Sequence, residues 1–500
     1  MRSHLDLGRS FLNWQHIMKQ TTLTQYDFVP RFLKLAVANI LSYLTVPLAS
    51  IVSVAFLGHL SDINQLTGVA LASALFIFIY FVFNFLRMAT TGVTAQAVGR
   101  NDEEETLLVG LRNGLIAIGL GLLILILQYP LQKLGFFLLN APLEVRDAAS
   151  AYYNARIWGA PAVFVNYVLS GWFLGLQLSN QVLLFSTIGN VANISLCYLF
   201  VVHLGWESMG AGLSEACGQY LMLLVALIFF SQKVKWKDIK AVLPRIWDLS
   251  AIKATFSLNG SISLNNLLMV VTWAIFNKQG AAIGKIVFTE NALIFEIFAL
   301  LMYFVEGLGV ATESFSGKFT GEGAKDRLIP LISVASGISF LTALAFAFVY
   351  AFFPKTLFGM LTNHPEVIEN IGLYAWWLLF VMGFASLAWI LQGYFLGLAE
   401  GNTIVKVSFI SLVIGFIPLA GVSEHFHNNH LLWLGVSLMM AIKLIGFSVE
   451  MPRTLRFETN ELTGTTSDGD RTLPSSEALD MADILDVAST KEKDGHLQVK

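Results

Sequence analysis

The stretch KIVFTENALIFEIFALLMYFVEGLGVATESFSGK, residues 285–318, decides the fold class. An α-helix rises about 1.5 Å per residue, so this run is longer than a bilayer crossing requires. It carries four carboxylates, Glu290, Glu296, Glu306 and Glu313. Each would cost roughly 2.5–3.5 kcal/mol facing lipid at mid-membrane, so these side chains require a polar interior. The chain is therefore expected to fold as a membrane helix bundle with a functional site inside it.

An ionisable group inside a membrane helix is by default a functional-site candidate, so all four glutamates are candidate site residues. Glu306 and Glu313 are seven residues apart and share a helix face, whereas Glu290 points away from them and Glu296 lies between. For Glu290 and Glu313 the alternative is a position near the helix ends, at the lipid interface. For Glu306 the alternative is a fixed pairing with Arg87 or with backbone that holds two helices together.

Composition agrees with a polytopic helical membrane protein. Hydrophobic residues make up 55% of the 500 residues and charged residues 13%, about half the charge of a soluble chain, and the mean hydropathy is +0.66. The apolar runs predict twelve transmembrane helices. Their approximate ranges are 33–59, 66–98, 107–128, 147–177, 181–203, 208–231, 251–277, 284–317, 328–352, 367–398, 403–421 and 430–450.

Basic residues are distributed unevenly over the loops. Five lie in the loop between the sixth and seventh spans, whereas the loops GHLSDINQL, HLGWES and VSEHFHNNH contain no Lys or Arg. The positive-inside rule then places both termini and the basic loops in the cytoplasm. The expected location is a bacterial-type plasma (inner) membrane. No cleavable signal peptide is evident in the first 30 residues. Residues 458–500 are polar and acidic and are expected to form a disordered tail, with a short helix at 476–487 as an alternative.

An internal repeat divides the chain into two halves. SGWFLGL at 170–176 matches QGYFLGL at 392–398 with an offset of 222 residues, and residues 87–100 align with 305–318 at an offset of 218. Two parallel six-helix repeats place a substrate site near the membrane midplane between them. The expected division is a cytoplasmic segment (1–32), an N-terminal lobe (33–232), a basic linker (233–250), a C-terminal lobe (251–452) and the acidic tail (453–500).

Polar residues inside the other spans are candidates for lining a substrate cavity. Arg87 is expected either to pair structurally or to line an anion-attracting wall. Gly159 and Pro161 are expected to loosen the helix near Arg156, and the alternative for Arg156 is to snorkel to the interface. Asn190 and Asn193 share a face, where hydrogen bonding between helices is the alternative to substrate contact. The full set of cavity candidates is Arg87, Gln96, Asn166, Asn190, Asn193, Asn265 and Asn291.

Several classes of function have no support in the sequence. There is no P-loop, no His-Glu-x-x-His and no Gly-x-Ser-x-Gly motif, so neither an enzyme nor direct ATP use is predicted. Cys197 and Cys217 lie in apolar runs and fit neither a disulfide nor a thiolate site. His425, His427 and His430 lack a suitable carboxylate partner besides Glu424, so no metal site is expected. No basic patch with interleaved aromatics indicates nucleic-acid binding.

Four stretches resemble the DinF-like branch of the multidrug and toxic compound extrusion (MATE) transporters. They are TVPLASIVSVAFLGHL (45–60), FLRMATTGVTAQAVGR (85–100), RIWGAPAVFVNYVLSGWFLGLQ (156–177) and VEGLGVATESFSGK (305–318). The resemblance covers roughly residues 30–452. It implies twelve helices in two six-helix lobes around a V-shaped cavity, and export of amphiphilic organic compounds in exchange for protons or sodium.

The chain departs from that family at two positions. Members often carry an aspartate on the first helix and another on the fifth, and the matching residues here are Ser53 and Cys197. Coupling is therefore expected to depend on the C-terminal lobe, through Glu306 and Glu313. The resulting hypothesis is a monomeric antiporter in the lipid bilayer that needs no cofactor beyond a proton or sodium gradient. A flippase for lipids or lipid-linked precursors is the alternative.

Overall fold

The computed structural model describes residues 25–60, 62–139, 142–358 and 365–455, and the predicted tail and its short helix lie outside them. Twelve helical spans in the described residues are long and apolar enough to cross a membrane, which confirms the all-α polytopic fold. Their bounds are Val29–Gly58, Ile63–Gly99, Glu103–Ile126, Leu143–Gly175, Ser179–His203, Glu207–Lys233, Leu249–Ile283, Lys285–Gly321, Lys325–Phe352, Ile371–Gly397, Gly401–Phe426 and Asn429–Leu455.

Several of these spans are interrupted. The second span consists of α3 (Ile63–Phe83) and α4 (Phe85–Gly99), which meet at Asn84. The fourth span contains α7 (Arg146–Arg156), a 3₁₀ turn at Ile157–Gly159 and α8 (Ala160–Gly175). Pro161 lies in the first turn of α8, where its missing N–H costs no hydrogen bond. The expected loosening near Gly159 is therefore present, and both breaks lie beside residues of the candidate site.

The remaining elements are mostly single helices. The fifth span, α9 (Ser179–Cys197), ends in a π-helical turn at Tyr198–His203, and a second π turn at Ser411–Phe416 joins α18 (Gly401–Ile410) to α19 (Ile417–Phe426). A short helix, α11 (Trp236–Val242), lies in the basic linker, where the sequence analysis expected no helix. The others are α2 (Val29–Gly58), α5 (Glu103–Ile126), α6 (Gln128–Leu138), α10 (Glu207–Lys233), α12 (Leu249–Ile283), α13 (Lys285–Gly321), α14 (Leu328–Phe352), α15 (Pro354–Phe358), α16 (Pro365–Ala375), α17 (Trp377–Gly397) and α20 (Asn429–Leu455).

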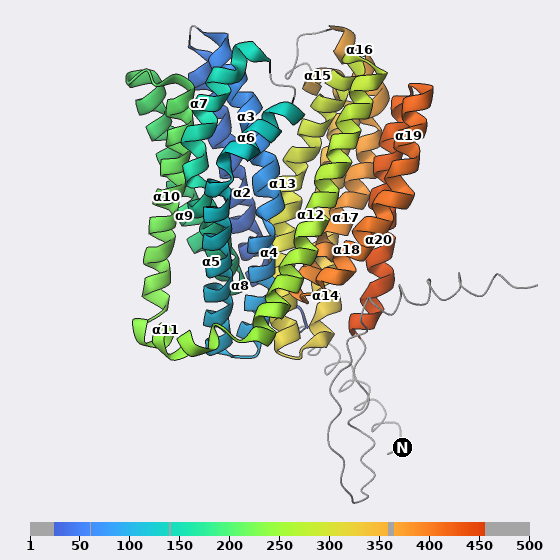
Figure 1. The fold of residues 1–500 in the computed structure, drawn as a ribbon. Helices are drawn as coiled ribbons and strands as arrows, with labels where there is room; N and C mark the ends of the chain where they lie inside the picture. Colours follow the sequence, from blue (N-terminus) through green and yellow to red (C-terminus); the bar gives the residue numbers. More distant parts are fainter. Residues whose placement is uncertain (1–24, 61, 140–141, 359–364, 456–500) are drawn as a thin grey trace, which may run out of the picture. The chain divides into compact units, whose positions relative to one another are not determined.

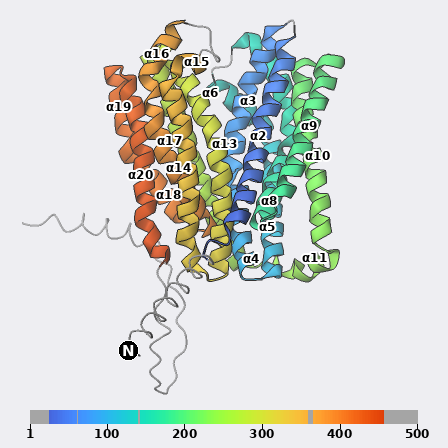
Figure 2. The same cartoon turned by 180° about the vertical axis from the view of Figure 1, so that it is seen from behind.

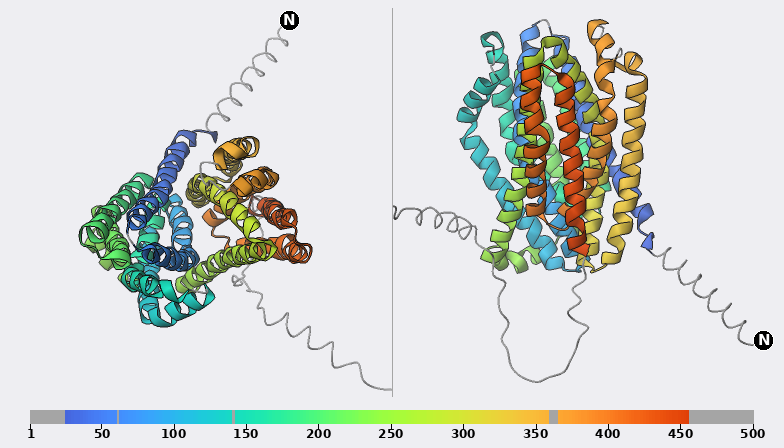
Figure 3. Two further views of the ribbon diagram at one scale, coloured as in Figure 1. Left: turned by 90° about the horizontal axis from the view of Figure 1, so that it is seen from above. Right: turned by 90° about the vertical axis from the view of Figure 1, so that its right-hand side faces the viewer.

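The helices gather into two bundles that follow the order of the chain (Figure 1). Helices α2 to α10 pack mainly with one another, as in the pairs α2–α9, α4–α8 and α9–α10, while α13–α17, α14–α17 and α17–α20 pack in the second bundle. Viewed along the helices, the blue-to-green members lie on one side and the yellow-to-red members on the other (Figure 3). The residue limits of the two lobes remain a prediction.

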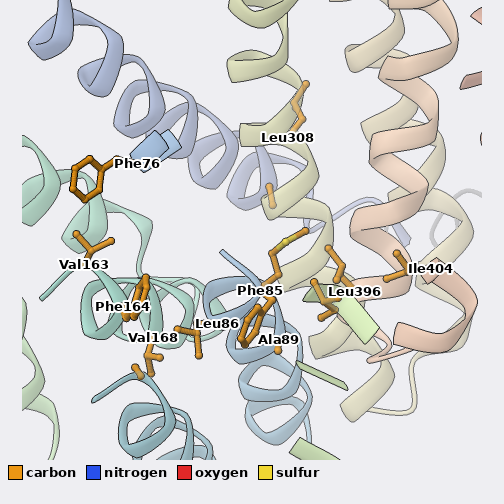
Figure 4. Packing of buried hydrophobic residues seen from close by; sticks show 14 of the residues in the cluster. Phe76, Phe85, Leu86, Ala89, Val163, Phe164, Val168, Leu308, Leu396 and Ile404 are labelled. Carbon is orange, nitrogen blue, oxygen red and sulfur yellow. The ribbon is translucent and has the colours of Figure 1, made fainter. Parts of the chain in front are cut away.

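Helix α13 joins the two bundles. It packs against α17 and α14 of its own bundle and also against α2 and α4 of the first, as the reverse view shows for α2 (Figure 2). One buried apolar cluster spans this contact and includes Phe85 and Ala89 on α4 together with Leu308 on α13 and Leu396 on α17 (Figure 4). The hydrophobic core is thus continuous across the interface between the halves.

Glycines bring the two halves into backbone contact at the end of α4 that lies near Lys318. A Cβ at Gly92 would collide with the carbonyl of Leu396, and one at Gly321 would collide with the carbonyl of Gln96. Gln96 Nε2 donates a hydrogen bond of 2.8 Å to the Gly397 carbonyl across the same contact. We call this region, formed by α4, α13 and α17, the glycine seam. Glycine is required at these positions because a Cβ would collide with the backbone of the neighbouring helix, and small residues let membrane helices approach closely.

Substituting Gly92 by Ala tests the seam, with Gly114→Ala on α5 as the matched control. Gly114 has no neighbour within 4 Å of a built Cβ, so alanine there should be neutral or stabilising by up to about 1 kcal/mol through helix propensity. Gly92→Ala should lower the thermal unfolding midpoint in detergent, because overpacking typically costs about 1–3 kcal/mol. Equal midpoints for the two variants would show that the halves do not approach as described.

Candidate functional site

The break at Asn84 places an arginine inside the membrane domain. Arg87 lies in the first turn of α4, and its Nε donates a hydrogen bond of 3.2 Å to Asn84 Oδ1. Its Nη2 donates to Glu306 Oε1 at 2.8 Å, across the interface from α13. Nη1 lies 3.9 Å from Glu313 Oε2 on the same helix. The structure thus brings together Arg87, Glu306 and Glu313, which we call the charged trio.

The trio is shielded from solvent to different degrees. The side chains of Arg87 and Glu313 are 6% and 1% exposed, whereas that of Glu306 is 25% exposed. Burying charges costs several kcal/mol each unless they are paired with good geometry. The Arg87–Glu306 contact meets that condition, because it is a direct charge-assisted hydrogen bond. The fixed Glu306–Arg87 pairing that the sequence analysis considered is therefore present.

Glu313 is the least satisfied member of the trio. Its Oε1, like Arg87 Nη1, has no hydrogen-bond partner among the described residues. Glu313 is buried between the halves and does not lie at the lipid interface that the sequence left open for it. One guanidinium cannot neutralise two carboxylates, so the trio carries one excess negative charge when both are ionised. A bound proton or monovalent cation would balance that charge.

A cavity of about 270 Å³ lies in the first bundle and is bordered by Arg87. Three tyrosines, Tyr43, Tyr80 and Tyr167, give it aromatic walls. Asn166 and Asn190, both predicted cavity residues, also line it, although each is already bonded. Asn166 Nδ2 donates to the Gln219 carbonyl at 3.0 Å, and Asn190 Nδ2 donates to Thr45 Oγ1 at 2.7 Å. For Asn190, this arrangement fits both the cavity role and the alternative of hydrogen bonding between helices, and Asn166 lines the cavity while it also bonds to another helix.

The same cavity is bordered by a second ion pair, whose side chains are 16% and 25% exposed. Arg156 Nη2 lies 2.7 Å from Glu215 Oε2, and Arg156 Nη1 donates to the Tyr152 hydroxyl at 2.7 Å. That hydroxyl in turn donates to Glu215 Oε1 at 2.7 Å and accepts from Ser73 Oγ at 2.9 Å. The Arg156 guanidinium also lies 4.6 Å from the ring centroid of Phe76. Arg156 therefore does not snorkel; it is fixed in the cavity wall.

Sequence reasoning did not assign a role to Tyr152 or Glu215 in this network. The i, i+4 spacing of Tyr152 and Arg156 on one helix was the available local signal. The contact with Glu215 depends on the packing of α7 against α10, which no local pattern encodes.

A second cavity, of about 390 Å³, lies on the other side of the charged trio. Glu306 and Asn265 line it together with Trp273, Trp389 and other mainly apolar residues. Tyr43 and Asn84 line both cavities. The Arg87–Glu306 bond therefore lies between the two cavities, with the arginine facing one and the carboxylate facing the other.

A polar chain crosses the wall of this second cavity. Ser408 Oγ donates to Asn265 Oδ1 at 2.6 Å, Asn265 Nδ2 donates to Asn266 Oδ1 at 3.3 Å, and Asn266 Nδ2 donates to the Phe81 carbonyl at 3.1 Å. These bonds link α18 through α12 to the end of α3 in the first bundle. Asn265 therefore also has a bridging role between the halves.

Other predicted site residues lie elsewhere. Gln96 is in the glycine seam, and Asn193 packs against Gly218 of α10. Asn291 exchanges 2.9 Å hydrogen bonds with Asn429 and borders neither cavity. Glu290, the residue before Asn291, is buried, and its Oε1 has no hydrogen-bond partner among the described residues. Glu296 is exposed. The structure thus unites Glu306 and Glu313 with Arg87 but not with the other two glutamates.

Ser53 and Cys197 occupy the positions where the resembled family often carries acids. The Cys197 thiol lies beside the hydroxyls of Ser53 and Ser214, and the Ser53 residue is buried. The two positions therefore meet in the first bundle, as a pair of acids would. Here they form an uncharged cluster, and the carboxylates that border the two cavities belong to the ion-paired Glu215 and to Glu306.

Removing the Tyr152 hydroxyl should weaken the Arg156–Glu215 network. Tyr152→Phe deletes one donor and one acceptor and leaves charged partners short of a hydrogen bond, at an expected cost of about 1–3 kcal/mol. The expected result is a lower thermal unfolding midpoint in detergent. Tyr129→Phe is the matched control because Tyr129 is exposed. An unchanged midpoint for Tyr152→Phe would mean that the network does not contribute to stability.

Comparison with known proteins identifies relatives of this chain. The MatE family model matches residues 38–199 and 262–420. DNA damage-inducible protein F of Escherichia coli strain K12 is 28% identical over 409 residues, covering 82% of this chain and 89% of that protein. Protein DETOXIFICATION 44, chloroplastic, of Arabidopsis thaliana is 24% identical and covers 80% of this chain and 77% of its own length.

Solved structures agree on the fold. A MATE protein in the bent conformation superposes with a TM-score of 0.77 at 19% identity, covering 87% of this chain and 97% of that one. An outward-facing multidrug resistance MATE family transporter of the MOP superfamily gives a TM-score of 0.76 at 19% identity, covering 85% and 96%. With the family model matching more than half of its residues, the chain is an integral membrane protein that belongs to the MatE family, the multidrug and toxic compound extrusion transporters.

Proposed function

We propose that the chain is a secondary active antiporter that exports amphiphilic organic compounds in exchange for protons or sodium. The single observation that carries this proposal is the charged trio, a buried carboxylate site placed between two cavities and between the two halves. Cation binding at this position can depend both on substrate in the adjoining cavities and on the position of one half relative to the other. Family membership favours extrusion of such compounds over the flippase alternative.

Binding of a proton at the trio would change the attraction between the halves. The Arg87–Glu306 contact is a charge-assisted bond, and a neutral carboxylic acid loses the Coulombic part of it. At 2.8 Å in a low-dielectric interior that part is a large share of the interaction. Protonation therefore loosens α4 from α13, and release of the proton restores the bond. The two conformations of an alternating-access cycle then differ in whether the Arg87–Glu306 hydrogen bond is formed.

A cationic amphiphile is the substrate class that fits best. Glu306 is the most accessible member of the trio and lines the second cavity, whereas Arg87 is almost fully buried. Trp273 and Trp389 provide aromatic surface in that cavity, which favours lipophilic cations through cation–π contact. A cation entering there competes with the proton for the same carboxylate. That competition is what exchange requires, because both ligands cannot be bound at once.

The basic loops support a cytoplasmic location for the end of the molecule that holds the glycine seam. Arg100 and Lys318 lie at that end of α4 and α13. Backbone contact across the seam supports a state closed to the cytoplasm. We propose that this monomeric chain has both described ends on the cytoplasmic side.

Proteoliposomes with an imposed pH or sodium gradient test the proposed function. Tetraphenylphosphonium, anilinonaphthalene sulfonate and progesterone serve as cationic, anionic and neutral probes, and pyranine inside the vesicles reports proton flux. Tetraphenylphosphonium movement against proton movement is the expected result, at rates above those of protein-free vesicles. Equal fluxes with and without either gradient would overturn the antiport proposal.

Glu306→Gln should reduce proton-driven transport in that assay by roughly tenfold or more, because the amide keeps the side-chain shape but cannot titrate. Glu296→Gln on the same helix is the matched control, since Glu296 is exposed and lines neither cavity. Glu306→Asp should retain part of the activity. Full transport by Glu306→Gln with an unchanged pH dependence would make Glu306 a purely structural residue.

Ser53→Ala and Cys197→Ala should leave gradient-driven transport within about twofold of the parent, because neither residue supplies a carboxylate. The measurement is the initial rate of pyranine response at matched protein content. Loss of coupling in Ser53→Ala, with normal folding, would show that the first-helix position still carries the cation and that the trio does not act alone.

A further inference from the structure

Lys443 is a buried lysine without an ionic partner. It lies near the middle of α20 and is 1% exposed, and its Nζ has no hydrogen-bond partner among the described residues. Its contacts are with aromatic rings. Nζ lies 5.0 Å from the ring centroid of Trp389 and 5.9 Å from that of Phe447. The sequence analysis did not single out this residue.

The charged groups on the neighbouring elements are engaged elsewhere. Helix α20 packs against α12, α17, α18, α19 and the π turn at Ser411–Phe416. Glu450 is bonded to Lys406 at 2.9 Å, Glu400 to Arg453 at 2.9 Å, and Glu424 accepts from Gln279 at 2.9 Å. In the described part of the chain no carboxylate lies within ion-pair distance of Lys443. The other titratable groups on these elements are Lys253, Lys278, Tyr394, His425, His427 and His430.

This environment supports an ammonium poorly. Taking an unpaired charge out of water is unfavourable, and contact with ring faces offsets only part of that cost. A primary amine, by contrast, fits among aromatic rings with little desolvation cost. Burial brings the ammonium and the neutral amine close in free energy, so a positive charge placed nearby decides which form is present. Lys443 therefore has the chemistry of a proton-exchange site whose occupancy depends on the charge of its surroundings.

Trp389 connects Lys443 to the second cavity. The indole is the ring closest to Nζ, and Trp389 also lines that cavity together with Glu306 and Gln392. A cation bound in the cavity would repel an ammonium on the other side of this residue. Cation binding and protonation at Lys443 therefore oppose each other, and by linkage each weakens the other to the same extent.

We propose that Lys443 is a second proton-binding site, which gives up its proton when a lipophilic cation occupies the second cavity and takes one up when the cation leaves. In this step the ammonium loses one N–H bond and its proton passes to water, leaving the neutral amine. The inference rests on the proposed function for its role in transport. The proton exchange itself is independent of transport and requires only cation binding.

The test compares the full-length protein with Lys443→Met and Lys443→Arg in weakly buffered detergent solution. Tetraphenylphosphonium is added, and a pH indicator dye records the protons released per cation bound. We expect Lys443→Met to release fewer protons than the parent, by up to about one per cation. Lys443→Arg should show the same loss because arginine does not deprotonate. Lys406→Met is the control, since Lys406 is 64% exposed in the same half.

Unchanged proton release in Lys443→Met would overturn the inference. Rescue by Lys443→Arg would also overturn it, because a structural cation–π contact is served equally well by arginine. Potentiometric titration without ligand provides a second measurement. Between about pH 5 and 9 the parent should bind up to one more proton than Lys443→Met, and parallel curves would contradict the proposal.

The two proposals fail in different ways. If the parent shows no gradient-driven flux in vesicles, the antiport function fails while the ligand-free titration still decides whether Lys443 exchanges a proton. If the parent transports tetraphenylphosphonium and Lys443→Met keeps the full pH dependence, only the Lys443 inference fails. Should Lys443→Arg not fold, Lys443→Gln replaces it in the titration as a second uncharged variant.

Discussion

The bond between Arg87 and Glu306 is the interaction on which the membrane domain depends. It is a charged hydrogen bond that joins α4 of the first bundle to α13 of the second, in a region with little water. A buried arginine needs a partner to be tolerated there. The break between α3 and α4 supplies a further acceptor through Asn84. The break between α3 and α4, the contact between the halves and the neutralisation of the Arg87 charge therefore all occur at one place.

Two of the contacts that hold the halves together respond differently to a proton. The glycine seam depends on van der Waals packing and backbone proximity, which do not change with pH. The charged trio depends on Coulombic attraction, which disappears when a carboxylate is neutralised. A transporter built this way has a pH-insensitive closure at one end and a titratable contact between its cavities. Rocking of the halves around the trio then requires no large rearrangement within either bundle.

The charges inside this chain are arranged asymmetrically. In the first bundle Ser53 and Cys197 form an uncharged cluster, and the Arg156–Glu215 pair is internally balanced. Two carboxylates share one guanidinium at the interface, on α13, and Lys443, which has no hydrogen-bond partner among the described residues, lies deep in the second bundle. The groups proposed to bind and release protons are thus concentrated at the interface and in the C-terminal half. Neither bundle repeats the charge pattern of the other, although the repeat relates their helices.

The sequence by itself determined the class of fold, the number of spans and the presence of carboxylates that must face a polar interior. These properties follow from composition and local periodicity, because lipid penalises every exposed polar group in the same way. It also placed Glu306 and Glu313 on one helix face. Only the tertiary structure decided that Arg87 lies against Glu306, that Arg156 bonds Tyr152 and Glu215, and that Lys443 has no carboxylate nearby. The Arg87–Glu306 and Tyr152–Glu215 contacts join residues 219 and 63 positions apart, and side-chain pairing at such distances depends on how helices pack, which local pattern does not encode.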